Sequence, residues 1–174
     1  MSKTSEFSHL DGDGKARMVD ISKKAPTVRT AGAEGFIKLD ENIVTKIKEN
    51  GLKKGDVFSV AKIAGINAAK KTWELVPLCH QLALTGIDIH FTILEEEYKV
   101  RVNSEVRTNY STGVEMEALT AVSTSLLAIY DMCKALSKNM QIGPIYLLNK
   151  TGGKSDYIKK TSKNTRNNKY SKNK

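Results

Sequence analysis

Hydrophobic and polar residues alternate between residues 86 and 107, in two runs on either side of three consecutive glutamates. The apolar positions of the two runs are Ile87, Ile89, Phe91 and Ile93, then Tyr98, Val100 and Val102. Successive side chains of a strand point to opposite faces of a sheet. The pattern therefore predicts a β-hairpin with one buried face.

The apolar spacing changes to three or four residues between residues 115 and 136. The positions that follow it are Met116, Leu119, Val122, Leu126, Ile129, Cys133 and Leu136. This spacing is typical of an amphipathic helix, so we expect one long helix here.

The other apolar stretches predict strands at residues 18–22, 27–39 and 145–149 and helices at residues 41–50 and from residue 56. Asp40 and Gly51 are suited to begin and end the first of these helices, and Pro77 must follow the second. The order of elements favours an α+β fold, a two-layer sandwich of an antiparallel sheet with helices on one face.

Charge is distributed unevenly along the 174 residues, whose formal net charge is +9. Residues 159–174 contain seven Lys or Arg and no acid, which leaves 21 basic and 19 acidic residues elsewhere. We therefore expect a single domain at residues 1–158 and a basic, disordered tail at residues 159–174. A nucleic-acid-binding tail is the alternative, but the nearly neutral body and the 6% aromatic content count against it.

Several protein classes are disfavoured. The longest apolar runs are shorter than the roughly 20 residues of a membrane span, and the first residues contain no apolar segment of a secretory signal. Cys79 and Cys133 form no CxxC pair, which fits a reducing compartment and a cytoplasmic protein. The three histidines have no metal-binding spacing, so we expect no protein-bound metal.

Cys79 and His80 follow Pro77 in a segment between a predicted helix and a predicted strand. Loops at such junctions often display functional side chains. The alternative is a small core cysteine beside a histidine without a special role. A catalytic Cys–His pair is disfavoured, because adjacent side chains of an extended segment point in opposite directions.

Glu115 and Glu117 lie at the start of the long helix. Thr112 and Glu115 have the spacing of a capping box, which is a structural explanation for the first carboxylate. Both carboxylates would reach one pocket only if the helix began after Glu115.

Asp131 and Lys134 are three residues apart, late in the same helix. An exposed pair at this spacing would contribute only about 0.2–0.5 kcal/mol. The apolar neighbours of Asp131 and the unfavourable helix dipole instead favour a partly buried couple suited to proton transfer.

Residues 150–155, KTGGKS, contain two glycines between Lys150 and Lys154. They do not complete a Walker A motif, because Leu148 stands where that motif requires glycine. The loop could still bring backbone N–H groups and ammonium groups to a phosphate, or be a flexible connection without a ligand.

The chain closely resembles the MoaC family, the cyclic pyranopterin monophosphate synthases of molybdenum cofactor biosynthesis. Over about residues 7–158, six motifs follow the family's order and near-family spacing: HLDGDGKARMVDIS, KKGDVFSVAKIAGINAAKKT, LVPLCHQL, STGVEMEALTAVS, IYDMCKA and LLNKTGGKS. The resemblance implies a ferredoxin-like subunit in a homo-hexamer, a trimer of dimers with active sites at subunit interfaces.

The same resemblance implies a lyase that needs no cofactor. Its substrate would be 3′,8-cyclic 7,8-dihydro-GTP, supplied by a radical SAM GTP cyclase. Its products would be cyclic pyranopterin monophosphate and pyrophosphate.

By resemblance, Asp131 is the central acid or base and Lys134 its cationic partner. The implied substrate-binding positions are Leu78, Cys79, His80, Met116 and Glu117, with Lys54, Glu115 and Lys150 as further pocket positions. Arg29, Lys70 and Lys154 are weaker candidates for phosphate contact. The chain departs from the family pattern at Gln81, where proline is usual, and at Asp156, where glycine is usual.

Overall fold

The computed structural model of the chain describes residues 10–49 and 55–160. Its elements in chain order are β1 (Thr27–Lys38), α1 (Glu41–Lys48), α2 (Val57–Lys70), α3 (Thr72–Leu75), β2 (Leu84–Leu94), a 3₁₀ turn (Glu95–Glu97), β3 (Lys99–Tyr110), α4 (Glu115–Cys133), β4 (Gln141–Thr151) and β5 (Tyr157–Ile158).

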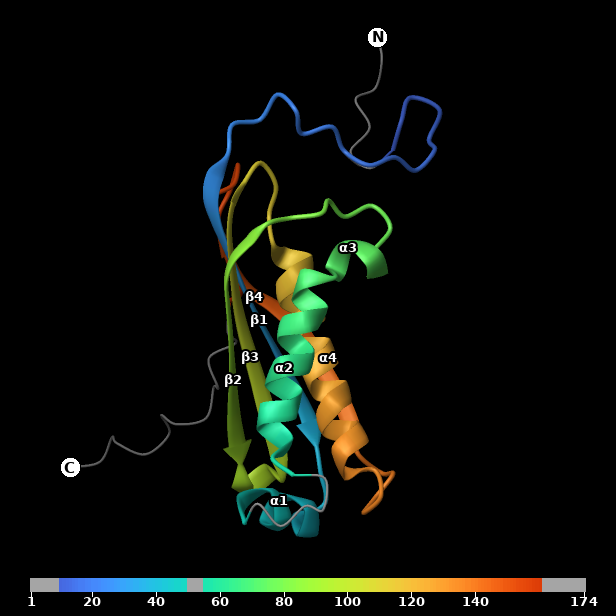
Figure 1. The fold of residues 1–174 in the computed structure, drawn as a ribbon, viewed down its shortest axis with the longest axis vertical. Helices are drawn as coiled ribbons and strands as arrows, with labels where there is room; N and C mark the ends of the chain where they lie inside the picture. The colour runs from blue at the N-terminus through green and yellow to red at the C-terminus, as the bar shows by residue number, and fades with distance from the viewer. Residues whose placement is uncertain (1–9, 50–54, 161–174) are drawn as a thin grey trace, which may run out of the picture.

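The strands form one sheet in the order β2-β3-β1-β4-β5, and every neighbouring pair is antiparallel. Up to β4, the strand order and the β-α-β-β-α-β order of elements along the chain are those of a ferredoxin-like fold. The predicted α+β fold is confirmed, and so is the hairpin, which is β2 and β3. Figure 1 shows the elongated sheet with its helices.

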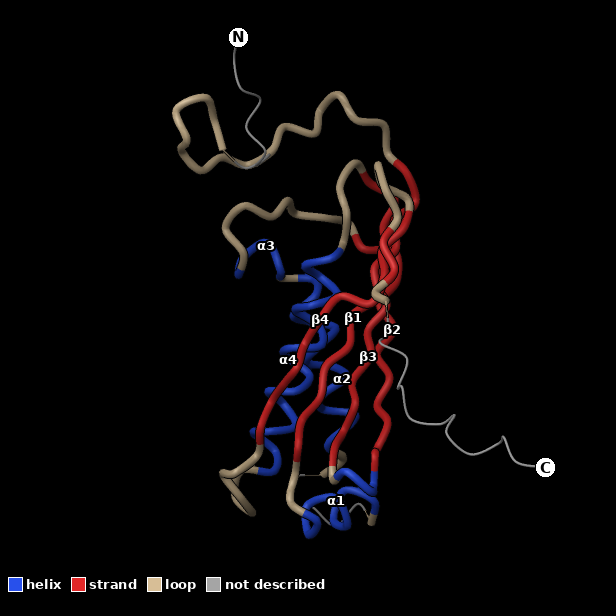
Figure 2. Tube along the Cα trace, turned by 180° about the vertical axis from the view of Figure 1, so that it is seen from behind, coloured by secondary structure: helices blue, strands red, loops and turns tan. Residues whose placement is uncertain are grey.

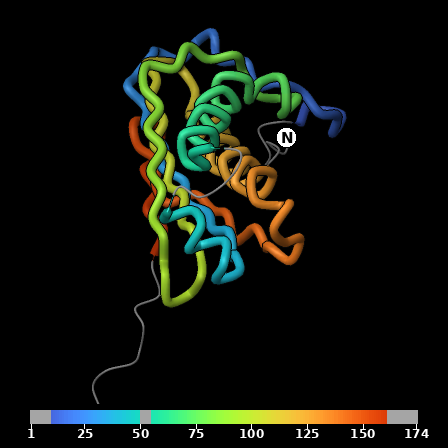
Figure 3. The backbone as a smooth tube through the Cα atoms, turned by 60° about the horizontal axis from the view of Figure 1, so that its bottom comes forward, coloured from blue at the N-terminus to red at the C-terminus, as the bar shows by residue number. Residues whose placement is uncertain are grey.

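Helices α2 and α4 pack against each other and cover one face of the sheet, as Figures 2 and 3 show. Gly65 of α2 allows this close packing, because a Cβ atom there would lie 2.2 Å from the Ser125 hydroxyl oxygen of α4. That hydroxyl donates a hydrogen bond of 3.0 Å to the carbonyl of Ala61. The two helices are therefore fixed against each other as one layer.

The core lies between this helix layer and the sheet. The alternating residues of the hairpin supply Ile89, Val100 and Val102 to it, and α4 supplies Val122, Leu126, Ile129 and Cys133. The prediction was wrong at the two ends of the long helix. Met116 and Leu136 are exposed, and the helix ends at Cys133, before Leu136.

The shorter elements differ more from expectation. Residues 27–39 correspond to the central strand β1, and the last long strand, β4, extends beyond residues 145–149 in both directions. The strand predicted at residues 18–22 is wrong, because this segment has no regular structure. Asp56 begins α2, where its carboxylate accepts hydrogen bonds from the N–H groups of Phe58 and Ser59.

Within the described residues, no helix is long and apolar enough to cross a membrane.

Candidate functional site

A cavity of about 540 Å³ lies at the end of the molecule where α4 begins. Five separate segments of the chain line it: the coil before β1, the start of β1, the loop before β2, the start of α4, and the end of β4 with its following loop. Seven of the substrate-binding positions expected from the resemblance are among its lining residues: Leu78, Cys79, His80, Glu115, Met116, Glu117 and Lys150. A single chain thus gathers most of the expected set.

Glu117 is the most unusual acid of this cavity, because only 4% of its surface is exposed. Burial raises the pKa of Glu117 to about 7, and the nearby charge of Glu115 acts in the same direction. A carboxyl group that titrates near neutral pH can both donate and accept a proton under physiological conditions.

The Cys79 thiol lies close enough to Glu117 to be affected by its charge. Burial raises the pKa of Cys79, and the carboxylate of Glu117 raises it further. Because the thiolate is the nucleophilic form of cysteine, this environment disfavours nucleophilic chemistry at Cys79. The thiol is therefore suited to contact a ligand rather than to attack it.

Glu115 is the first residue of α4 and forms an ion pair with Lys150 of β4, at 3.0 Å. The predicted capping box is wrong, since Val114 is the N-cap and no side chain caps the helix. The ion pair with Lys150 takes the place of the local hydrogen bond. Both Glu115 and Glu117 line the cavity although the helix begins at Glu115 itself, so the expectation that this required a later helix start was wrong.

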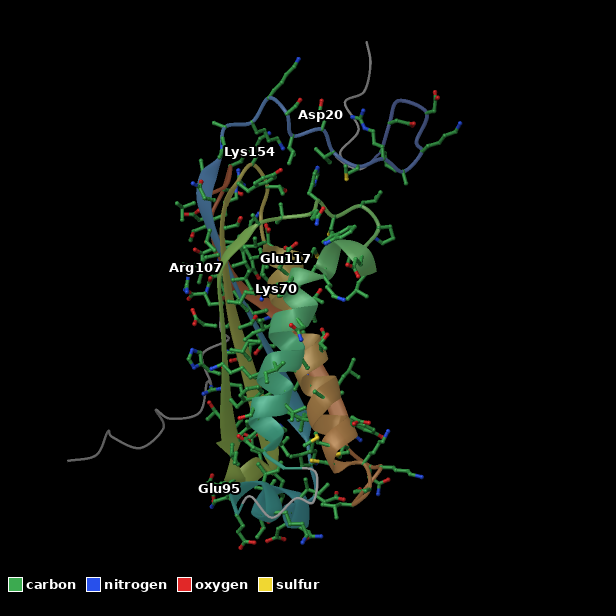
Figure 4. All side chains as sticks on the ribbon, in the orientation of Figure 1. Asp20, Lys70, Glu95, Arg107, Glu117 and Lys154 are labelled. Carbon is green, nitrogen blue, oxygen red and sulfur yellow. The ribbon has the colours of Figure 1, made fainter. Side chains whose placement is uncertain are left out.

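The loop after β4 is held by contacts from two sides. Gly152 has a φ of +82°, its carbonyl accepts a hydrogen bond of 2.7 Å from the Thr27 hydroxyl, and its N–H donates to the Asp156 carboxylate at 3.2 Å. The loop presents Lys154 to the cavity, which Arg29 and Lys24 also line. Lys154 and Glu117, both labelled in Figure 4, lie in the same half of the molecule. This end can therefore neutralise a polyanionic ligand.

Asp131 and Lys134 lie near the opposite end of α4, as the course of this helix in Figure 1 shows. Their carboxylate and ammonium groups are 2.7 Å apart, with 58% and 53% of the side chains exposed. The expected partial burial is wrong for the single chain. The helix rise puts Asp131 about 21 Å from Glu117 along the axis, so one chain does not bring this pair to the cavity.

One of the expected cations that the structure describes does not line the cavity of the single chain. Lys70 is exposed at the end of α2 and is absent from the cavity lining. Lys54 lies outside the described residues.

The sequence analysis missed the contribution of the coil before β1. Val19, Ile21 and Lys24 line the cavity, and the carbonyl of Val19 lies 2.9 Å from Nε2 of His80. The strand prediction for residues 18–22 thus came from a half-buried apolar stretch, in which Val19 and Ile21 face a cavity instead of a sheet.

The described residues contain no group of three or more His, Cys, Asp or Glu side chains arranged to hold a metal ion.

Comparison with known proteins places these features in one family. The sequence model of the MoaC family matches residues 18–153. The chain is 51% identical over 158 residues to the cyclic pyranopterin monophosphate synthase of Geobacillus thermodenitrificans, covering 90% of this chain and 98% of the relative. It is 52% identical over 160 residues to the synthase of that name from Bacillus thuringiensis subsp. konkukian, covering 90% and 99%. The Brevibacillus brevis synthase is 51% identical over 152 residues, covering 87% and 94%.

Proposed function

Because the chain belongs to the MoaC family, we propose that it is a cyclic pyranopterin monophosphate synthase of molybdenum cofactor biosynthesis. In the proposed reaction it converts 3′,8-cyclic 7,8-dihydro-GTP to cyclic pyranopterin monophosphate and releases pyrophosphate. The observation that carries this proposal is the cavity, which combines cations for a triphosphate with groups that exchange protons, in a chain about half identical to such synthases.

The cations of the cavity suit the anionic part of this substrate. Lys24, Arg29, Lys150 and Lys154 come from three different segments and line the same space. Pyrophosphate is a better leaving group when fixed positive charges stabilise the charge that develops on it. These residues would bind the triphosphate and assist its cleavage. Arg29 and Lys154, which were candidates for phosphate contact, would thus act in this way.

The uncharged part of the substrate needs groups that move protons, because opening a purine ring and closing a pterin ring both require proton transfers. Glu117, with its pKa raised to about 7, is suited to this, since transfer is efficient when the pKa lies near the working pH. The imidazole of His80 also lines the cavity and can hydrogen-bond to the ring system. Leu78, Cys79 and Met116 would contact the ring system. The reaction is redox-neutral overall, so we propose no redox cofactor.

We assign Asp131 as the central acid or base and Lys134 as its cationic partner, acting in the cavity of a neighbouring subunit. The hydrogen bond to Asp131 raises the pKa of Lys134, so this residue remains an ammonium group. Support comes from the surface beside the pair. Leu127, one helical turn before Asp131, is 59% exposed, and Ile63 of the adjacent helix α2 is 62% exposed.

Exposed apolar side chains next to a charged pair are typical of a surface that another protein covers. We propose that a second copy of this chain covers it, within a homo-hexamer built as a trimer of dimers. Each active site would then combine the cavity of one subunit with Asp131 and Lys134 of another. Lys54 and Lys70 would complete the cationic set.

The substrate must be formed from GTP by an earlier cyclisation. We therefore propose a functional link to a radical SAM GTP cyclase and a cytoplasmic location for both enzymes.

The test is incubation of the purified protein with the cyclised nucleotide, followed by measurement of pyrophosphate and of the pterin product. We expect both to form in equal amounts. If neither forms with a correctly assembled protein, the proposed function is refuted. Deletion of residues 159–174 should leave turnover intact. If nucleic-acid binding without catalysis were the function instead, the same deletion would abolish the activity of the protein in cells; the comparisons give no support for this alternative.

A further inference from the structure

His80 is joined to a distant segment by one hydrogen bond. Its Nε2 atom lies 2.9 Å from the carbonyl oxygen of Val19, a residue 61 positions earlier in the chain. A carbonyl oxygen can only accept a hydrogen bond, so Nε2 must carry the proton. In neutral imidazole the other nitrogen, Nδ1, is then an acceptor. Among the described residues, no hydrogen bond to Nδ1 is found.

The carbonyl of Val19 is held in place by hydrogen bonds of the residues that follow it in the coil. Asp20, labelled on the coil in Figure 4, accepts a hydrogen bond of 2.9 Å from the N–H of Ser22. The N–H of Lys24 donates to the carbonyl of Ile21 at 3.0 Å. The Ser111 hydroxyl then donates to the carbonyl of Lys24 at 2.7 Å, which ties the coil to the segment between β3 and α4.

The same contact closes one side of the cavity. Val19 and Ile21 are half-buried and line it, as His80 does from the loop before β2. The coil has no strand or helix hydrogen bonds over residues 17–26. The His80–Val19 contact is therefore a principal attachment of this wall to the loop that carries His80.

We infer that the Val19 carbonyl fixes His80 in the tautomer with its proton on Nε2, which leaves Nδ1 to accept a hydrogen bond from an N–H or O–H group of the substrate. The identity of that ligand rests on the proposed function; the tautomer and the attachment of the coil rest on the geometry alone. His80 would then contact the substrate, and Val19 would position His80 through its backbone.

This assignment divides the cavity by chemistry. The ammonium and guanidinium groups can only donate hydrogen bonds and attract the phosphates. An unprotonated Nδ1 instead selects a donor, such as a ring N–H of the reduced purine or a ribose hydroxyl. A ligand that presents only acceptors at this position would be bound less well, because it would leave Nδ1 without a partner.

The tautomer can be measured directly. The full-length protein, labelled with ¹⁵N-histidine, contains three histidines, and the His80 signals are those absent from the spectrum of the His80→Gln variant. Solid-state ¹⁵N NMR without ligand, at an alkaline pH at which imidazole is neutral, should show a protonated Nε2 and an unprotonated Nδ1 for His80. The opposite assignment, or an equal mixture of the two tautomers, overturns the inference. The Val19→Ala variant keeps the carbonyl and should give the wild-type pattern.

Two variants of His80 separate the roles of its nitrogens. Glutamine can place an amide N–H near the position of Nε2, so His80→Gln should keep the bond to Val19 but lose the acceptor. Asparagine is too short to reach Val19, so His80→Asn should release the coil. Trypsin cleavage after the exposed Arg17 and Lys23 reports the release.

We expect cleavage of His80→Gln at the wild-type rate and about fivefold faster cleavage of His80→Asn, which corresponds to the loss of one hydrogen bond. The KM of His80→Gln should rise about tenfold although its coil stays attached. Equal cleavage of both variants, or an unchanged KM in His80→Gln, contradicts the inference. If the wild-type protein shows the predicted tautomer but no turnover, the proposed function fails and the assignment of His80 stands.

Discussion

The Lys134 ammonium group lies 2.7 Å from the Asp131 carboxylate on an exposed turn of α4. An isolated surface pair of this kind contributes little to stability. Replacing either partner should therefore leave the fold intact, and any large effect on turnover must come from chemistry. We predict that Lys134→Ala and Asp131→Asn each lower kcat by about 10²–10⁴-fold, the usual range for the loss of a proton-transfer group.

Pyrophosphate release at saturating substrate measures this effect. Circular dichroism and size-exclusion chromatography check that both variants remain folded and assembled. Lys138→Ala is a matched control, because Lys138 is also an exposed lysine just beyond α4. Wild-type activity of Lys134→Ala would remove the proposed role of the pair.

The distance between Asp131 and the cavity leads to a prediction about mixed assemblies. If each active site combines two chains, a His80→Ala protein, which binds substrate weakly, and a Lys134→Ala protein, which turns over slowly, should complement each other when assayed at low substrate concentration. Random exchange of subunits would restore up to about a quarter of the sites, since each restored site needs one intact contribution from each of two chains. The two variants are unfolded together, refolded, and assayed.

A mixture without any regained activity, although native mass spectrometry shows mixed oligomers, would place the complete site within one chain. Refolding of each variant alone is the control, and it should give only the low activity of that variant.

The raised pKa of Glu117 predicts a specific dependence of stability on pH. An unfolded chain ionises its glutamates near pH 4.3, whereas folding raises the pKa of Glu117 to about 7 because the side chain is buried. Between these values the folded state binds more protons than the unfolded state. The contribution of Glu117 is therefore fully present below about pH 4 and is lost as the pH rises through 7, by roughly 3–4 kcal/mol.

Urea denaturation at a fixed protein concentration, from pH 4 to pH 8, should show this loss in the wild type. The Glu117→Gln variant cannot ionise at this position and should lose less stability over the same range. Glu96→Gln changes an exposed glutamate and should follow the wild type. Parallel curves for the wild type and Glu117→Gln would show that Glu117 titrates normally.

Gly152 and Gly153 form a matched pair for testing the loop after β4. A Cβ atom at Gly152 would lie 1.9 Å from the Val28 carbonyl, and the φ of +82° is unfavourable for any other residue. Gly152→Ala should cost about 1–3 kcal/mol of stability and raise the KM, because Lys154 moves with the loop. At Gly153 the nearest atom is the flexible end of Arg29, at 3.1 Å.

Gly153→Ala should therefore lie close to the wild type in thermal stability and raise the KM less than Gly152→Ala does. Thermal denaturation and steady-state kinetics measure the two properties separately. Equal effects of the two substitutions would mean that the backbone conformation of Gly152 is unimportant for the loop.

The sequence predicted those elements that bury one face. The hairpin β2–β3 and the middle of α4 each repeat apolar residues at the period of their own geometry, and each packs against the core. The strand predicted from the apolar stretch at residues 18–22 was wrong, because apolar side chains alone do not indicate what they pack against. Here Val19 and Ile21 face a cavity, so no strand forms.

Two errors arose where a local motif competed with a distant residue. Thr112 and Glu115 had capping-box spacing, but Lys150 of β4 pairs with Glu115. Asp131 has apolar neighbours in sequence, yet Met132 and Cys133 turn toward the core while Asp131 faces outward. Adjacent helical residues point in different directions, so neighbours alone do not predict burial.

Seven of the substrate-binding positions expected from the motifs do line one cavity. These positions were chosen by resemblance to a family, because their spacing in the sequence did not identify them.

The placement of Glu117 and Asp131 at opposite ends of one rigid helix has a consequence for mixed populations of chains in a cell. Under the proposed assembly every copy serves two reaction centres, its own and a neighbour's. A copy with substitutions at both Glu117 and Asp131 would inactivate two reaction centres, its own and one shared with a neighbour. An allele that encodes such a copy should therefore be dominant over the normal gene when both are expressed.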